Sequence, residues 1–139
     1  MLLVATTVGP SRIEGLGLFA TEPIAAGTEV WRWHPVFDVF VPDAEVAALP
    51  APAQTFLDRY AYPAPDLPGG LSLNLDDARF MNHSDDPTLE TVGEVCIARR
   101  DIGAGEELTC DYGAFHPGLR DAIRSASAPE RRDPEGRGN

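Results

Sequence analysis

Residues 79–84 read Arg-Phe-Met-Asn-His-Ser, so three consecutive hydrogen-bonding side chains follow an apolar Phe-Met pair directly. Taken alone, this run is compatible with an Asx-type turn that holds a hydrogen-bonded histidine. It is also compatible with a metal cluster of His83, Asp85 and Asp86. We disfavour the cluster because adjacent residues rarely converge on one ion. The run becomes informative only together with two other segments of the chain.

The two accompanying segments both contain glycines. The first is Gly15-Leu16-Gly17, and the second, residues 105–113, reads Gly-Glu-Glu-Leu-Thr-Cys-Asp-Tyr-Gly. A lone G-x-G is usually a turn, and this one lacks the third glycine and the ribose-binding acid of a dinucleotide site. The second segment predicts a turn followed by a strand. By itself it leaves Tyr112 open as a core residue or as a functional one.

Length and charge limit the classes of function. The chain of 139 residues is long enough for one domain with a single hydrophobic core. It carries 22 acidic residues against 11 basic ones, and all the basic residues are arginines, which gives a net charge of −11. Such a charge repels phosphates and anionic lipids, so nucleic-acid and membrane partners are disfavoured and a basic protein partner is favoured.

Cysteine usage and targeting signals point to a reducing compartment. Cys96 and Cys110 form neither a disulfide framework nor a C-x-x-C metal site. We find no signal peptide and no apolar run long enough to span a membrane. These observations favour a cytoplasmic protein.

The chain contains 13 glycines and 13 prolines, which is typical of many short elements joined by tight turns. We therefore expect a mostly β fold with short helices. The predicted strands are 2–8, 18–21, 29–33, 36–41, 71–75, 88–92, 94–98 and 108–110. The predicted helices are 44–49 with Asp43 as its cap, a second one with Ala53, Phe56, Leu57 and Tyr60 on one face, and 118–126.

Two segments of the chain echo each other. Residues 24–30 read Ile-Ala-Ala-Gly-Thr-Glu-Val, and residues 102–108 read Ile-Gly-Ala-Gly-Glu-Glu-Leu. Both predict a turn that leads into a strand, with Gly27 and Gly105 supplying the positive φ that such turns need. We expect two similar β-arches at opposite ends of one domain.

In this order and spacing, the three segments resemble the SET domain of protein-lysine methyltransferases, whose members show G-x-G, then R-F-x-N-H-S, then G-E-E-L-T-x-D-Y. The resemblance covers residues 5–113, with a variable insert at about 42–76. It implies a β-clip-like fold of small sheets in which the C-terminal segment passes through a loop as a pseudoknot. Residues 114–139 are then expected to form a short closing segment and a mobile tail.

The resemblance also implies a binding site for S-adenosylmethionine and no metal. The glycine segment is expected at the methionine end, Asn82 and His83 at the amino and adenine portions, and Tyr112 as the catalytic tyrosine. Arg79 opens the same motif, and Phe115 is either the aromatic residue that closes the pocket or a hydrophobic anchor. The implied cofactor-binding residues are Gly15, Leu16, Gly17, Arg79, Asn82, His83 and Tyr112, with Tyr62 and Phe115 as further candidates.

The chain departs from the family pattern at several positions. Trp33 stands where relatives usually carry a tyrosine, which places it in the wall of the lysine channel, or else makes it a buried strand aromatic. In the insert, either Tyr60 or Tyr62 can reach the pocket. We favour Tyr62 for the cofactor pocket and the channel, because Tyr60 belongs to the apolar helix face. Further departures are Asp85, Thr88 and Cys110, which replace Cys, Asn and an aromatic residue.

The sequence leaves three functions open. The leading one is an S-adenosylmethionine-dependent protein-lysine methyltransferase that acts on a basic protein with an accessible lysine, such as a nucleoid, histone-like or ribosomal protein. The second is a non-catalytic SET-like module that binds a basic peptide. The third is a small metal-dependent hydrolase that uses His83, Asp85 and Asp86. A monomer and a homodimer are both compatible with the sequence.

Overall fold

The computed structural model describes residues 1–64 and 66–114, and it confirms the mostly β fold with short helices. The strands are β1 (Thr6–Pro10), β2 (Leu16–Ala20), β3 (Glu29–Arg32), β4 (Asp38–Pro42), β5 (Gly70–Asn74), β6 (Asn82–His83), β7 (Leu89–Val92), β8 (Val95–Ala98) and β9 (Glu107–Cys110). The helices are α1 (Asp43–Ala48), α2 (Ala51–Tyr60) and the two 3-10 helices η1 (Asp77–Phe80) and η2 (Tyr112–Ala114).

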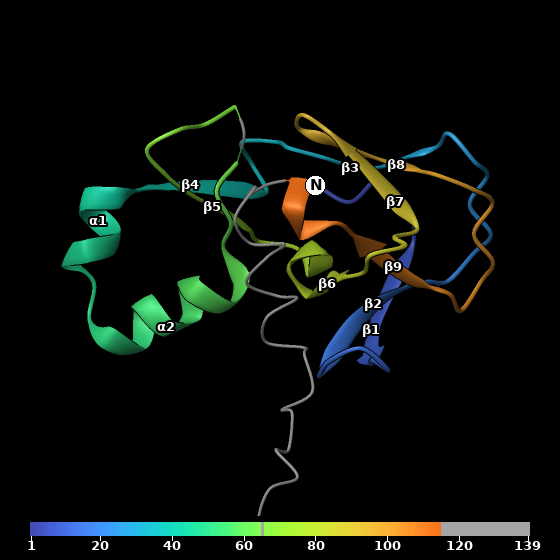
Figure 1. The fold of residues 1–139 in the computed structure, drawn as a ribbon, viewed down its shortest axis with the longest axis horizontal. Helices are drawn as coiled ribbons and strands as arrows, with labels where there is room; N and C mark the ends of the chain where they lie inside the picture. The colour runs from blue at the N-terminus through green and yellow to red at the C-terminus, as the bar shows by residue number, and fades with distance from the viewer. Residues whose placement is uncertain (65, 115–139) are drawn as a thin grey trace, which may run out of the picture.

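The strands form three small sheets (Figure 1). One has the order β1-β2-β9-β6, the second has the order β3-β8-β7, and β4 and β5 pair as a two-stranded ribbon. Helices α1 and α2 lie together beside this ribbon, away from β7 and β8 (Figure 1). None of the helices among the described residues is long and apolar enough to cross a membrane.

Several predicted element boundaries are wrong, and the reasons are local. β1 begins only at Thr6 and runs through Pro10, while Leu2 makes a single bridge to Trp31. Pro10 is tolerated because β1 is an edge strand, where a missing N–H removes no ladder bond. Asp43 is the first residue of α1 and not its cap, since Pro42 takes the cap position without a side-chain hydrogen bond.

Helix α2 forms where the apolar spacing predicts it, but its predicted core face is wrong. Only Leu57 of that face is buried, whereas Phe56 is 45% exposed. Tyr60 is half-buried and contacts the rings of Phe56 and Phe80. The outer part of this face therefore borders a cleft and not the core.

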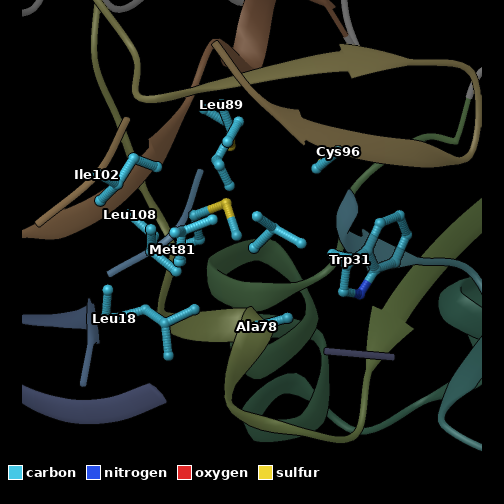
Figure 2. Packing of buried hydrophobic residues seen from close by; sticks show 13 residues of the cluster. Leu18, Trp31, Ala78, Met81, Leu89, Cys96, Ile102 and Leu108 are labelled. Atoms are coloured by element: carbon cyan, nitrogen blue, oxygen red, sulfur yellow. The ribbon is translucent and has the colours of Figure 1, made fainter. Parts of the chain in front are cut away.

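One hydrophobic core joins the four-stranded and the three-stranded sheet (Figure 2). Leu18 and Leu108 lie opposite one another in β2 and β9, and both are completely buried. Met81 lies in the middle of the labelled cluster, whereas Trp31 lies at its side (Figure 2). Because Met81 immediately precedes β6, this burial holds the Asn-His pair at a defined depth beside the core.

The two β-arches are neighbours, so their predicted placement at opposite ends of the domain is wrong. Ile24 and Ile102 exchange backbone hydrogen bonds of 2.8 Å in both directions, and both side chains are buried. The positive φ is confirmed at Gly27 (82°) and at Gly105 (86°). The repeated isoleucines meet because each can bury its side chain against the other's arch.

The Asn-His pair forms a strand, so the Asx-turn interpretation is wrong. β6 runs parallel to β9, with Asn82 opposite Thr109 and His83 opposite Cys110. Beside this pairing, the buried residues Thr88 and Thr109 bond reciprocally, because each backbone N–H donates to the other's hydroxyl oxygen at 3.0 and 2.9 Å. Together with the hydrogen bond between Asn82 and Glu107, which are 25 positions apart in the sequence, these contacts fix β6 against β9.

Three expectations lie outside the described residues. They are the position of Phe115, the helix at 118–126 and the mobile tail. The threading of the pseudoknot also needs residues beyond Ala114. The described portion shows β9 between β2 and β6, where the last family segment meets the other two.

We expect Thr109→Val to lower the free energy of unfolding by about 2 kcal/mol, because the buried N–H of Thr88 loses its acceptor while the side-chain volume hardly changes. Urea denaturation followed by circular dichroism measures this. Thr7→Val makes the same change at an exposed position of β1 and is expected to alter stability by less than about 0.5 kcal/mol. Equal effects of the two substitutions would contradict the assigned role of the Thr88–Thr109 pair.

Candidate functional site

A pocket of about 540 Å³ lies between α2, η1 and the β6–β9 pair, which is a volume typical of small-molecule sites. Its mouth carries charged and polar groups from Glu14, Asp58, Arg59 and Arg79. Its buried end is mainly apolar and contains Trp31, Met81, Cys96 and Cys110. The pocket therefore suits a ligand with one charged end and one end that must be kept from water.

Asn82 lines this pocket with a fixed amide orientation. Its Nδ2 donates to the carbonyl oxygens of Glu14 at 3.2 Å and Leu16 at 3.0 Å, and to the carboxylate of Glu107 at 3.0 Å. All three partners can only accept, so the nitrogen must face them. The amide oxygen is then the atom that Asn82 offers to a ligand.

His83 is held in one tautomer. Its Nδ1 lies 3.0 Å from the backbone nitrogen of Tyr112 and accepts that N–H. Its Nε2 therefore carries the proton and donates to Asp85 at 3.2 Å. This arrangement ties the start of η2 to β6 and sets the position of the Tyr112 backbone.

The Tyr112 side chain reaches the buried end of the pocket. Its hydroxyl donates to the carbonyl oxygen of Met81 at 2.5 Å, and its ring lies 5.4 Å from the ring of His83. Burial raises the pKa of this hydroxyl, and the Cys110 and Glu14 groups act in the same direction. Because the proton points at Met81, the oxygen lone pairs remain available toward the pocket.

Tyr62 joins the buried end of the pocket to a group of carboxylates. Burial, followed by the charges of Asp38 and Glu94, raises the pKa of its hydroxyl. Burial also raises the pKa of Glu94, with the charge of Asp66 as the next cause. Asp38 itself is 3% exposed. Two carboxylates therefore act on Tyr62, and that of Asp38 is ion-paired with the N-terminal ammonium at 3.2 Å.

Aromatic and cationic groups form the wall near the mouth. The Arg59 guanidinium lies 5.4 Å from the centre of the Tyr60 ring, and the Arg79 guanidinium lies 4.6 Å from that of Phe80. The two rings contact edge to face at 5.8 Å. Of these rings, Tyr60 lines the pocket, and its position beside the two guanidinium groups suits a heteroaromatic ligand that also carries an anionic group.

The structure brings Arg79, Asn82, His83, Tyr62 and Tyr112 into the wall of this one pocket. Tyr60 lines it too, so both tyrosines of the insert reach it. The assigned roles of all these residues stay predictions, because position alone does not test them.

Other predicted residues lie elsewhere. The pocket wall contains Ile13 and Glu14 but not the adjacent Gly15, Leu16 and Gly17. Gly17 instead leaves room for Glu107, whose Oε1 would lie 2.1 Å from a Cβ at that position.

Trp33, which follows the end of β3, is absent from the described pocket wall, whereas Trp31 within β3 lines it. Trp33 is half-buried and packs against the core. Its backbone N–H donates to the Glu94 carbonyl oxygen at 3.0 Å. A place for Trp33 in a channel stays a prediction.

The sequence reasoning missed Trp31 and Glu107. Trp31 lies opposite Cys96 in the β3–β8 pair, and a register of that kind leaves no local signal in the sequence. Glu107 lies inside the quoted segment 105–113, where an acidic residue between a turn and a strand was visible but had no assigned partner.

The residues of the metal hypothesis do not converge. Asp85 accepts from His83, whereas the Asp86 carboxylate lies 3.4 Å from the guanidinium of Arg99. In the described part of the chain, no three His, Cys, Asp or Glu side chains are grouped so that they could hold a metal ion. The hydrolase hypothesis thus lacks a ligand set in residues 1–64 and 66–114.

In a comparison with protein families, the family model of the SET domain matches residues 15–113. The matched segment begins at the glycine pair and ends just after Tyr112, so it contains all three quoted segments. A comparison with curated proteins gives no match.

Solved structures share the fold. A Plasmodium falciparum protein described as a candidate histone methyltransferase is 23% identical with a TM-score of 0.56, over 81% of this chain and 96% of that one. The Polycomb Repressive Complex 2 of Chaetomium thermophilum, in a humanized form with the inhibitor GSK126, is 25% identical with a TM-score of 0.60, over 85% of this chain and 16% of that one. The apo form of the same complex in an autoinhibited state is 25% identical with a TM-score of 0.61, over 88% of this chain and 17% of that one. The chain thus spans about one sixth of the length of the Polycomb chains.

The buried tyrosines predict how stability depends on alkaline pH. The raised pKa values keep Tyr62 and Tyr112 neutral in the folded state, while the unfolded chain ionises them from about pH 10. Their contribution to stability is thus intact below about pH 10 and is lost as the pH rises further. The chain has no lysine, but burial also raises the pKa values of the Cys96 and Cys110 thiols, so their contribution is lost over the same alkaline range.

We expect the free energy of unfolding in urea to fall between about pH 9 and 11, and Tyr62→Phe or Tyr112→Phe to reduce that fall by about 1 kcal/mol each. Each phenylalanine variant serves as the control for the other. A fall that is as steep in both variants as in the wild type would contradict the burial of these hydroxyls.

Proposed function

This chain belongs to the SET domain family, and on that premise we propose that it transfers a methyl group from S-adenosylmethionine to a lysine amine of a protein substrate. The observation that carries the proposal is the single pocket that has Asn82 and His83 in its wall and the Tyr112 hydroxyl at its buried end. The description of the Plasmodium falciparum neighbour as a histone methyltransferase is in line with this reaction class.

The residues in the pocket fit S-adenosylmethionine as a donor. The oxygen of the Asn82 amide matches a protonated amine, and the Arg59 and Arg79 guanidinium groups at the mouth match a carboxylate. The ring of Tyr60 in the pocket wall offers an aromatic face for an adenine. When bound, this molecule supplies an activated methyl group on a positively charged sulfur.

The task of the chain is to place and deprotonate the amine. A lysine with a reference pKa near 10.4 has to become neutral before it can attack, and a buried apolar wall favours the neutral form. Cys96, Cys110 and Met81 provide such a wall. The lone pairs of the Tyr112 hydroxyl can accept from the amine and hold it in line, which is where most of the rate gain of a direct displacement arises.

The charge of the chain supports a basic substrate. The whole chain carries a net charge of −11, from 22 acidic residues against 11 arginines. Such a field raises the encounter rate with a lysine-bearing basic segment. We propose a nucleoid, histone-like or ribosomal protein as the type of partner on this ground.

Binding of the donor is the first test. We expect titration calorimetry to show that S-adenosylmethionine binds the purified chain, and that Asn82→Ala weakens the binding about tenfold, because the variant removes a hydrogen bond to a charged group. Thr7→Ala, on the exposed side of β1, is the control and leaves the affinity unchanged. Absence of binding by the wild type at high ligand concentration would rule out the proposed reaction.

Transfer of a radiolabelled methyl group to proteins of a cell lysate is the second test. We expect labelled bands that Tyr112→Phe reduces about a hundredfold, since the variant loses the hydroxyl that orients the amine. Tyr60→Phe keeps its ring at the pocket mouth and is expected to lose less than about threefold. Donor binding without any labelled protein would instead favour the non-catalytic module, which the departures from the family pattern at Trp33, Asp85 and Cys110 motivate.

A further inference from the structure

We propose that Glu107, held by Ser11, is a positioning residue that turns the Asn82 amide oxygen toward the pocket and so gives the site its preference for ligands with a protonated amine. The inference rests on the proposed function, because it names the feature by which this chain would recognise the amino-acid end of its donor. Glu107 itself is absent from the described wall of the pocket and acts through Asn82.

The first step is the set of atoms around the Asn82 nitrogen. Nδ2 has two hydrogens but three acceptors at 3.0–3.2 Å, of which two are the carbonyl oxygens of Glu14 and Leu16. The third, the Glu107 carboxylate, carries a full charge and forms the strongest of the three bonds. An inverted amide would set its oxygen against all three acceptors, so the inverted orientation is strongly disfavoured.

The second step is that the Glu107 carboxylate is itself fixed. The Ser11 hydroxyl donates to it, with Oγ at 2.7 Å from Oε1 and 3.0 Å from Oε2. The Ser11 Oγ also accepts from the backbone N–H of Ile13 at 2.9 Å. On the other side, a Cβ at Gly17 would overlap Oε1, so only glycine leaves space for the carboxylate there. Ser11, Gly17 and Asn82 thus enclose it on three sides.

The third step is the consequence for recognition. Because the Asn82 nitrogen is directed at the Glu107 carboxylate and the two carbonyl oxygens, the pocket is left with the amide oxygen of Asn82. That oxygen accepts from an ammonium group and repels a carboxylate. Loss of the charged acceptor weakens this preference, because the amide then reorients at lower cost. The affinity for the adenosine portion of a ligand does not depend on that orientation, so the two portions of the ligand respond differently.

The experiment compares two ligands by titration calorimetry. S-adenosylhomocysteine carries the amino-acid end, and 5′-methylthioadenosine keeps the adenosine and thioether without it. We expect Glu107→Gln to raise the Kd for S-adenosylhomocysteine about fivefold and that for 5′-methylthioadenosine less than twofold. Glu106→Gln makes the same change at the adjacent, half-buried residue, which pairs with Arg100 outside the pocket wall, and leaves both constants unchanged.

A second variant covers the case in which Glu107→Gln does not fold. Ser11→Ala removes the hydroxyl that holds the carboxylate and is expected to shift the same ligand ratio by about twofold with little change in Tm. Equal losses for both ligands, or no loss in either variant, would overturn the positioning role. Wild-type protein that binds neither ligand would contradict the proposed function itself, so the two failures are distinguishable.

Discussion

The parallel pairing of the two-residue strand β6 with β9 is the constraint on which the remaining structure depends. β9 lies between β2 and β6, so this pairing brings the segment 105–113 between the glycine segment and the Asn-His motif. The reciprocal bonds of Thr88 and Thr109 hold β9 from a third direction. Parallel pairs need a long connection, and here 23 residues separate His83 from Glu107. Local propensity alone cannot form such a contact.

The same pairing fixes which groups lie at the buried end of the pocket and which lie at its mouth. Backbone bonds from β6 and β9 set His83 against Tyr112, and the Tyr112 hydroxyl then meets the Met81 carbonyl at the buried end. Neutral, raised-pKa tyrosines surround that end, whereas arginines lie at the mouth. Polarity therefore changes along the pocket from charged to apolar, as a donor with a charged amino-acid end and a reaction that needs a neutral amine both require.

Sequence patterns predicted the elements better than their surroundings. The apolar spacing placed α2 correctly, yet Phe56 on the apolar face of that helix is 45% exposed among the described residues. The similarity of the two arches correctly predicted the positive φ at Gly27 and Gly105. It did not predict the backbone hydrogen bonds between Ile24 and Ile102. Periodicity reports which face of an element is apolar, and it contains no information about which other element lies against that face.

The sequence by itself determined the family, because the order and composition of the three segments are specific. The family in turn gave a short list of residues expected around one pocket. Only the tertiary structure decided that Trp31 and not Trp33 lines the described pocket wall, and that Glu107 lies within reach of Asn82. The physical reason is that both outcomes depend on how elements end and meet, which no local pattern records. β3 ends at Arg32, so Trp33 lies outside the strand, and Asn82 meets Glu107 across 25 positions of the sequence.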